Sequence, residues 1–268
     1  MSPLKECILN KNTKIKPIWL MRQAGRYLPE FRKIRKNNQD FIKLCLNENL
    51  SSEITLQPIK RFSFDAAIIF SDILMLPYAM NQEVKFEKGF GPKLGKLDIE
   101  KINQLKEEDF TKKLGPVYKA ISEVSQNNLL QNRDMIGFVG APWTILVYML
   151  NKSSPKNGLS GNFFNDHSLI KILLENIEKF LKLHIKNQVN AGANVIQIFD
   201  SWAGLLEDNI PEYIYEPTFN IVEYAKKLGA PIICFPRGIK DYKKYCEIVK
   251  PDAVNIDYEV DPKKIVKD

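Results

Sequence analysis

The sequence is poor in the residues that build metal centres and disulfide frameworks. Its 268 residues include only two histidines and four cysteines. The cysteines have no CxxC spacing and no histidine lies close to any of them, so no metal site is expected. We expect buried or idle thiols of a reducing compartment at all four positions. These positions are Cys7, Cys45, Cys234 and Cys246.

Long apolar runs and a secretory leader are also absent. The longest apolar strings, residues 66–70 and 145–150, are far shorter than the roughly 18 residues that a membrane span needs. The first 16 residues carry lysines but no apolar stretch of the signal-peptide type. These features predict a cytoplasmic protein that does not enter a membrane.

A glycine-rich nucleotide-binding loop is missing as well. The one glycine cluster, residues 89–95, has the wrong spacing for GxGxxG and follows no convincing strand, which argues against a doubly wound fold. Five short apolar runs alternate instead with helix-length segments, and this pattern predicts a parallel sheet. The runs are Ala66–Asp72, Met135–Gly140, Asn194–Asp200, Pro231–Phe235 and Ala253–Asp257.

Polar residues follow most of these runs, as expected at the mouth of a (β/α)8 TIM-type barrel. We therefore predict an α/β fold with one barrel domain over residues 1–268. Eight strands are required, and Glu83–Glu87 supplies only a possible sixth, so the last strands are expected to be missing from this chain. A chain that ends at Asp268 should leave an open sheet edge and be unstable alone. The clearest helix is predicted from Ser168 to Val189, with Asp166 or Ser168 as its cap.

The positive charge is unusual in how it is distributed. The net charge is +7, and lysines, which are spread along the chain, supply most of it. This spread argues against a nucleic-acid-binding stripe, a reading that would rest on the charge alone. Arginine is concentrated instead, because four of the seven lie within fourteen residues, at Arg22, Arg26, Arg32 and Arg35.

An arginine cluster favours an anion-binding loop, because the guanidinium binds a carboxylate or phosphate at two points. A merely solvated charged loop is the alternative. The apolar residues interleaved with the arginines, among them Trp19, Met21 and Ala24, argue against that alternative, since a solvated loop does not need them.

Several stretches resemble one known family. Residues 17–26 read PIWLMRQAGR, residues 69–74 read IFSDIL and residues 137–144 read GFVGAPWT. These stretches resemble the motifs of uroporphyrinogen decarboxylase in sequence, order and spacing. The similarity continues through residues 53–74 and 197–204, so that it spans nearly the whole chain.

The resemblance implies a carboxy-lyase of porphyrin and haem biosynthesis. Such an enzyme removes the four acetate carboxylates of uroporphyrinogen III, a small-molecule substrate with eight carboxylates, and gives coproporphyrinogen III without a cofactor. It also implies a homodimer that binds neither nucleic acid nor membrane. An inactive fragment, or a non-catalytic anion- or porphyrin-binding domain of the same fold, is the alternative.

The resemblance also assigns site residues. Asp72 would accept hydrogen bonds from the pyrrole N–H groups and stabilise the cationic ring, and Arg22 is the family's favoured proton donor. A bound water or a substrate carboxylic acid rivals Arg22, because a guanidinium is a poor acid. Arg35 is a weaker candidate for a carboxylate contact. The full predicted substrate site is Arg22, Gln23, Ala24, Gly25, Arg26, Asp72, Tyr148 and Ser201.

Structural roles compete with these assignments. Asp72 could cap a helix, Ser201 could cap a loop, and Tyr148 could simply pack on its helix. The Gly-His-Gly contact that the family carries late in its sequence is not found here, and we expect His167 and His184 to be surface or capping groups. Zinc-dependent methyltransferases of related fold need a His-x-Cys pair, which the sequence lacks.

Overall fold

The computed structural model describes residues 2–12, 14–87, 89–156, 158–161, 163–208 and 210–265. Its main sheet has five strands that are parallel throughout, in the order β1-β4-β5-β6-β7. Every strand comes from one of the five predicted runs, so the predicted α/β class is confirmed. The strands are β1 (Ala66–Ile68), β4 (Asp134–Gly140), β5 (Val195–Asp200), β6 (Ile232–Pro236) and β7 (Ala253–Val254).

The two edge strands are shorter than predicted. Strand β1 has three residues and β7 has two, whereas the apolar runs suggested seven and five. Each of them has a single neighbour among the described strands, so the sheet is open at β1 and at β7. An edge strand has ladder bonds on one side only, which limits how far regular pairing extends.

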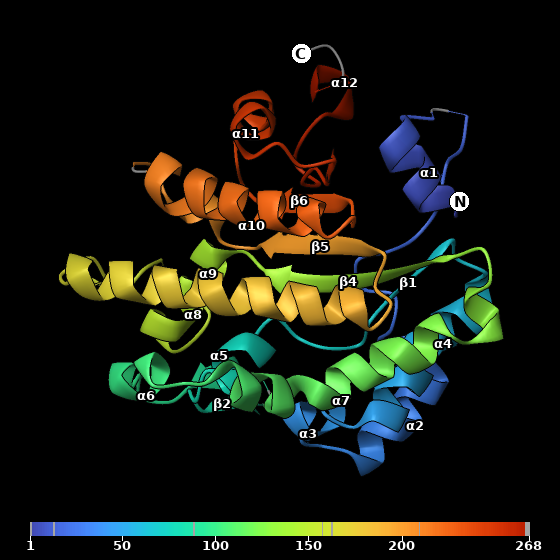
Figure 1. Ribbon diagram of the computed structural model, residues 1–268, viewed down its shortest axis with the longest axis horizontal. Helices are drawn as coiled ribbons and strands as arrows, with labels where there is room; N and C mark the ends of the chain where they lie inside the picture. The colour runs from blue at the N-terminus through green and yellow to red at the C-terminus, as the bar shows by residue number, and fades with distance from the viewer. Residues whose placement is uncertain are drawn as a thin grey trace.

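Helices connect the strands, as parallel pairing requires. Helices α7, α9 and α10 lie side by side along the sheet in Figure 1 and contact one another in that order. The connecting helices are α4 (Glu48–Phe62), α7 (Glu107–Ser125), α8 (Pro142–Asn151), α9 (His167–Asn190), α10 (Glu216–Lys227) and α11 (Tyr242–Val249). Shorter elements are α2 (Pro29–Asn37), α3 (Phe41–Cys45), α5 (Met75–Ala79), α6 (Ile99–Asn103), α12 (Pro262–Ile265), two 3-10 turns at Asn128–Leu130 and Ala203–Leu205, and a π-helical turn at Pro211–Tyr215.

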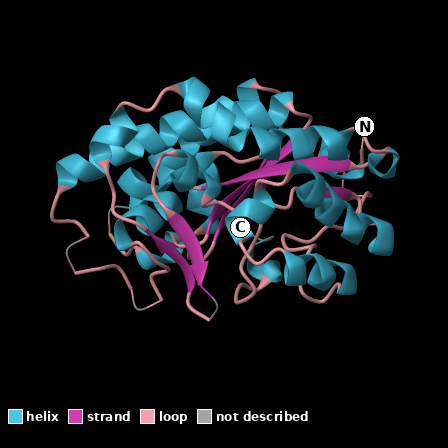
Figure 2. Ribbon diagram, turned by 90° about the horizontal axis from the view of Figure 1, so that it is seen from below, coloured by secondary structure: helices cyan, strands magenta, loops and turns pink. Residues whose placement is uncertain are grey.

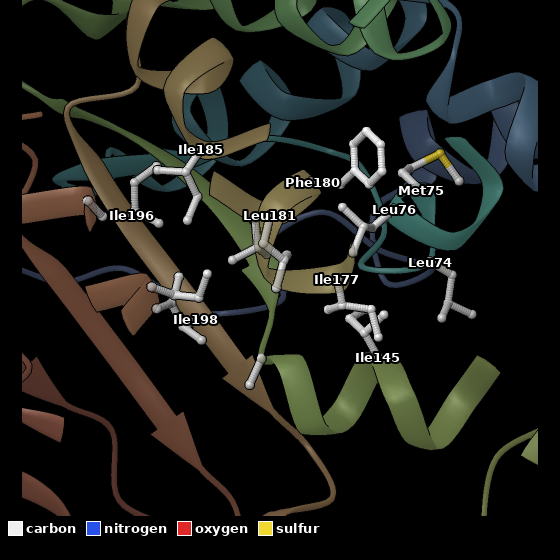
Figure 3. Packing of buried hydrophobic residues seen from close by; sticks show 14 of the residues in the cluster. Leu74, Met75, Leu76, Ile145, Ile177, Phe180, Leu181, Ile185, Ile196 and Ile198 are labelled. Carbon is white, nitrogen blue, oxygen red and sulfur yellow. The ribbon is translucent and has the colours of Figure 1, made fainter. Parts of the chain in front are cut away.

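Side chains of each strand point alternately to two apolar layers, because successive residues of a strand face opposite sides of the sheet. On the helix-covered face, Ile196 and Ile198 of β5 pack toward Leu181 and Ile185 of α9 (Figure 3). On the other face a smaller cluster forms, in which residues from β1, β4, β5 and β6 meet the N-terminal helix. Its buried members are Leu4, Ala66, Ile68, Ile136, Val195 and Ile233.

The N-terminal helix α1 (Pro3–Asn10) closes one end of this second layer. Asp134, the first residue of β4, is buried and accepts hydrogen bonds from Ser2 Oγ at 2.5 Å and from the Lys5 amide at 3.1 Å. Helix α1 is therefore anchored at the amino ends of the strands, on the right in Figure 1. The carboxyl ends of the strands lie away from this anchor.

One predicted strand does not join the sheet. Residues 83–87, the possible sixth barrel strand, contribute β2 (Val84–Glu87), which pairs antiparallel with β3 (Gly91–Leu94). Figure 2 shows this hairpin apart from the main sheet. Two glycines with positive φ, Gly89 at +85° and Gly91 at +90°, allow the tight return of the chain. The prediction that this segment belongs to the barrel is therefore wrong.

Helix α9 confirms one prediction and corrects another. Its cap is Asp166, whose side chain accepts from the Leu169 amide at 2.9 Å, as predicted. His184, however, is buried rather than at the surface, with Nδ1 3.0 Å from the Tyr118 hydroxyl. Burial lowers the pKa of His184 to about 3, so that the ring is neutral.

None of the described helices combines the length and the apolarity that a bilayer span requires.

Candidate active site

The predicted site residues lie on loops that follow the carboxyl ends of the strands. All pairs in the main sheet are parallel, so these ends share one side of the molecule. In barrel folds this side holds the active site. We call the surface that these loops form together the mouth; its predicted ligand-facing residues are Arg22, Arg26, Asp72, Tyr148 and Ser201.

The arginine loop before α2 is held by its own residues. The side chain of Gln23 is buried and accepts from the Leu20 amide at 3.0 Å, so it shapes the loop rather than facing outward. The Tyr27 hydroxyl donates to the Gln23 carbonyl oxygen. Arg32 donates from Nη1 to the Arg26 carbonyl oxygen at 2.8 Å. One arginine of the cluster thus fixes the backbone of another.

The four arginines divide into two classes. Arg22 and Arg26 are exposed, and neither side chain has an ion pair or a hydrogen bond within the described ranges. Arg35 instead donates to the carbonyl oxygens of Asn38 and Gln39 at the end of α2. The predicted ligand contact of Arg35 is therefore not supported, because its guanidinium caps a helix.

Ala24 and Gly25 connect the loop to its surroundings. Ala24 packs into an apolar cluster together with Leu28 and Phe70. The Gly25 carbonyl oxygen accepts from the Leu28 amide at 3.0 Å. A Cβ on Gly25 would meet only the Tyr27 ring, at 3.6 Å, so the protein itself has room for a side chain at this position.

Asp72 lies next to the arginine loop because the turn after β1 is tied to α4. The Phe70 carbonyl oxygen accepts from Ser51 Oγ at 2.7 Å, and the Phe70 amide donates to Thr55 Oγ1 at 2.9 Å. Phe70 in turn packs in the cluster that contains Ala24. The chain therefore leaves β1 directly beside the loop that carries Arg22.

The Asp72 carboxyl is half-buried and electrostatically coupled to Arg22. Burial raises its pKa from 3.8 to about 6, against the Leu74 amide and the positive charge of Arg22, which both lower it. Oδ1 accepts from the Leu74 amide at 2.8 Å, two residues on, just before α5 begins at Met75. The local turn therefore orients the carboxyl, and no protein hydrogen bond to Oδ2 is found in the described part of the chain.

The turn after Asp72 packs against the end of β4. A Cβ on Gly140 would lie 2.7 Å from Ile145 Cδ1 and 3.2 Å from Ile73 Cβ, so only glycine lets these segments approach so closely. The chain then enters α8, which carries Tyr148. Tyr148 is half-buried, with its ring 6.0 Å from that of Trp202.

A buried network fixes the loop after β5. Thr144 on α8 donates from Oγ1 to Asp200 Oδ1 at 2.6 Å, and Thr144 Oγ1 also accepts from the Trp202 amide at 3.1 Å. Trp143 Nε1 donates to the Trp202 carbonyl oxygen at 2.9 Å. Ser201, between these anchored residues, is half-buried. The motif of residues 137–144 contained Thr144, but nothing in the sequence indicated its link to Asp200.

Asp200 is the ionisable group of this network. It is fully buried, and burial raises its pKa from 3.8 to about 7, while the Thr144 hydroxyl opposes the rise. A carboxyl whose pKa is higher in the folded than in the unfolded protein stabilises the fold while it is protonated. This contribution is fully present below the unfolded pKa and is lost as the pH rises through the folded pKa. We expect the free energy of unfolding to fall between about pH 4 and pH 7 on this account.

Thr144→Val should reduce the free energy of unfolding by about 1–3 kcal/mol, because it keeps the shape but removes a buried donor and acceptor. Urea unfolding at pH 7 measures this change. Thr144→Ser is the matched control, and it should stay within about 1 kcal/mol of wild type because it keeps the hydroxyl. Equal effects of valine and serine would contradict a role of the hydroxyl network.

No group of three or more histidines, cysteines, aspartates or glutamates that could hold a metal ion occurs among the described residues. The four thiols are unpaired; Cys45 and Cys234 are buried, and Cys7 and Cys246 are half-buried. The candidate site thus consists of two unpaired arginines, one half-buried carboxyl and two hydroxyls.

Comparison with known proteins identifies the same family as the sequence motifs. The family model described as Uroporphyrinogen decarboxylase (URO-D) matches residues 1–268. A uroporphyrinogen decarboxylase of Rickettsia bellii is 42% identical over 90% of this chain and 72% of its own length. One of Orientia tsutsugamushi is 39% identical over 100% of this chain and 79% of its own length.

A solved structure shows a similar fold at low identity. A methyltransferase from Methanosarcina mazei superimposes with a TM-score of 0.69 over 94% of this chain and 80% of its own, at 14% identity. This similarity concerns the fold alone. The family match over the whole chain and the identities near 40% together show that the chain belongs to the uroporphyrinogen decarboxylase family.

Proposed function

We propose that the mouth decarboxylates the four acetate side chains of uroporphyrinogen III and releases coproporphyrinogen III; the relatives are named uroporphyrinogen decarboxylase. The observation that carries this proposal is the position of the half-buried Asp72 carboxyl beside the arginine loop, where the positive charge of Arg22 lowers the pKa of that carboxyl. A polycarboxylate needs cationic groups at its rim, and a reaction that builds positive charge on a ring needs an anion at its centre.

The chemistry requires little from the protein beyond charge. Protonation of the ring carbon next to the one that carries an acetate makes the ring an iminium-like electron acceptor that is conjugated with the acetate-bearing carbon. The bond between the acetate methylene and its carboxylate then breaks, its electrons pass into the ring, and CO2 leaves. Transfer of a proton to the methylene carbon and loss of one from the ring leave a methyl group. Since the ring holds the electrons, we expect no cofactor.

In this proposal Asp72 stabilises the cationic ring. Its pKa of about 6 leaves the carboxyl mainly ionised at neutral pH. The Leu74 amide holds Oδ1, which leaves Oδ2 to accept hydrogen bonds from pyrrole N–H groups. A negative charge that is already oriented before the reaction stabilises the transition state without reorganisation.

Arg22 and Arg26 are proposed to bind carboxylates of the substrate, with the backbone of Gln23, Ala24 and Gly25 lining the same loop. A guanidinium has a pKa above about 12 and is a poor acid, so we assign the proton to a bound water or a substrate carboxylic acid. Arg22 would then act through its charge. Tyr148 and Ser201 are proposed as hydroxyl contacts from the opposite side of the mouth.

Three further proposals concern the protein as a whole; the oligomeric state rests on the family, and the other two rest on the sequence. We propose that residues 1–268 belong to a single domain, that the protein is a homodimer and that it acts in the cytoplasm. Sedimentation or light scattering of the purified protein measures the oligomeric state.

The pH profile of kcat/KM tests the roles of Asp72 and Arg22 together. Protonation of Asp72 removes the required anion, so activity should fall as pH drops through about 6. Arg22 lowers the pKa of Asp72, so Arg22→Gln should move this acidic limb to higher pH in addition to weakening binding. Steady-state rates between pH 5 and pH 8 would show the shift.

Lys33→Gln is the control for a general effect of charge, because Lys33 is an exposed cation of α2 whose side chain has no hydrogen bond or ion pair among the described residues. It should leave the position of the acidic limb unchanged. An acidic limb that stays in place when Arg22 is replaced would argue against the coupling of Arg22 and Asp72.

A further inference from the structure

A hollow of about 230 Å³ opens at the carboxyl ends of β5, β6 and β7. Ser201 and Trp202 line it on the β5 side, and Arg237 and Asp257 line it on the side of β6 and β7. The hollow therefore adjoins the mouth through Ser201, and its lining includes no residue of the arginine loop. Arg237 is not among the residues proposed to bind or decarboxylate the substrate.

The backbone of Arg237 is fixed on both sides. Its amide donates to the Asp200 carbonyl oxygen at 3.0 Å, and its own carbonyl oxygen accepts from the Gly204 amide at 3.0 Å. A Cβ on Gly204 would lie 2.8 Å from the Cα of Gly238, which has a φ of +81°. The loops after β5 and β6 thus touch backbone to backbone, and this contact holds Arg237 beside Ser201.

The side chain of Arg237 is attracted by a neighbouring carboxylate, but its hydrogen-bond donors remain available. About half of it is exposed, and its Nε lies 3.8 Å from Oδ2 of the nearly buried Asp257. This distance is too long for a hydrogen bond. Asp257 Oδ1 is engaged with the Tyr258 amide at 2.7 Å. Within the described ranges, no hydrogen bond is found for the Arg237 guanidinium, which leaves its fork of donors facing the hollow.

We propose that Arg237 is a second carboxylate-binding point, on the side of the mouth that Ser201 marks. This inference rests on the proposed function, because it needs a ligand with carboxylates around its rim. A macrocycle that contacts both Asp72 and Ser201 would bring a peripheral carboxylate toward the hollow. The Arg237 fork would bind it at two points, as arginine does with carboxylates.

Arg237→Gln should raise KM for uroporphyrinogen about 10-fold and leave kcat within about twofold, because the contact is charge-assisted and remote from the reacting ring. Lys240→Gln is the matched control. It removes one positive charge from the same loop at an exposed position and should leave KM unchanged within about twofold. Equal effects of the two variants, or an unchanged KM for Arg237→Gln, would overturn the proposal.

Asp257→Asn separates ligand binding from a purely structural ion pair. Asparagine keeps the oxygen that accepts from the Tyr258 amide but removes the charge next to Arg237. If the pair served only to join the two loops, Asp257→Asn would weaken substrate binding as much as Arg237→Gln does. The proposal predicts the opposite, namely unchanged or tighter binding, since the guanidinium no longer has the charge of Asp257 beside it to compete with the ligand carboxylate.

Equilibrium binding of two porphyrinogens under anaerobic conditions identifies the carboxylate. Coproporphyrinogen keeps the four propionates of uroporphyrinogen but none of its acetates. Weaker binding of both compounds to Arg237→Gln would assign a propionate, and weaker binding of uroporphyrinogen alone would assign an acetate. Unchanged binding of both would refute the site. A wild-type protein that binds but does not decarboxylate would refute the proposed function instead.

Discussion

Asp72→Asn should lower kcat about 10²–10³-fold and leave the fold nearly intact. Asparagine has the shape of aspartate and keeps the oxygen that accepts from the Leu74 amide, but it carries no charge to face the cationic ring. Anaerobic turnover of uroporphyrinogen by the purified variant and wild-type proteins measures the loss. The pH profile should also lose its limb near pH 6, because the group that titrates there is gone.

Asp40→Asn is the matched control for Asp72→Asn. Asp40 is an exposed aspartate whose side chain accepts from the Lys43 amide at 3.1 Å, and asparagine can keep that bond. Its kcat should equal that of wild type. An Asp72→Asn variant within about threefold of wild type would mean that Asp72 serves only to orient the turn before α5.

Trp143→Ala should lower the free energy of unfolding by about 3–5 kcal/mol, a large part of the roughly 5–15 kcal/mol that stabilises a domain. Trp143 is completely buried, with its ring 5.6 Å from that of Phe163 and 5.8 Å from that of Tyr213. The change also removes the donor to the Trp202 carbonyl oxygen. Chemical denaturation at constant pH measures the effect.

Phe90→Ala tests whether any large aromatic would behave in the same way. Phe90 is 71% exposed, so its removal should change the free energy of unfolding by no more than about 0.5 kcal/mol. If Trp143→Ala were equally mild, α8 could not be the rigid support that holds Thr144 and Tyr148 in place.

The main strands could be predicted because both faces of the sheet are covered. A strand such as β5, which is buried on both faces, consists of a continuous apolar run that is easy to find in the sequence. The alternation of such runs with helices predicts that the strands are parallel. Strand β2 was misassigned because pairing depends on the return of the chain at Gly89 and Gly91, which composition does not encode. Its pattern suited an edge hairpin as well as a barrel strand.

Burial of polar residues was harder to predict. His184 continues the apolar series of Leu181 and Ile185 on α9, and this position on the helix could have indicated a buried ring. Its partner Tyr118 lies 66 residues away in sequence, on a different helix. No local pattern connects them, so the pairing is found only in three dimensions.

Some residues of the candidate site could be found from local motifs, whereas the contacts between distant segments could not. Asp72 and the arginine loop came from short motifs, because the chemistry of each is visible in a few adjacent residues. The bond from Thr144 to Asp200 spans 56 residues, and Arg237 faces Asp257 across two loops. Arg35 lies in the same charged segment as Arg22 but binds its own helix end, a difference that the sequence does not reveal.

Product analysis shows whether the mouth decarboxylates uroporphyrinogen with Asp72 as its essential anion. The purified protein would be incubated anaerobically with uroporphyrinogen III and a metal chelator, and coproporphyrinogen and CO2 would be quantified. We expect four CO2 for each coproporphyrinogen III formed by the wild-type protein, without an added cofactor, and almost none from Asp72→Asn. A folded wild-type protein that binds uroporphyrinogen but releases no CO2, or that needs a metal to do so, would contradict it.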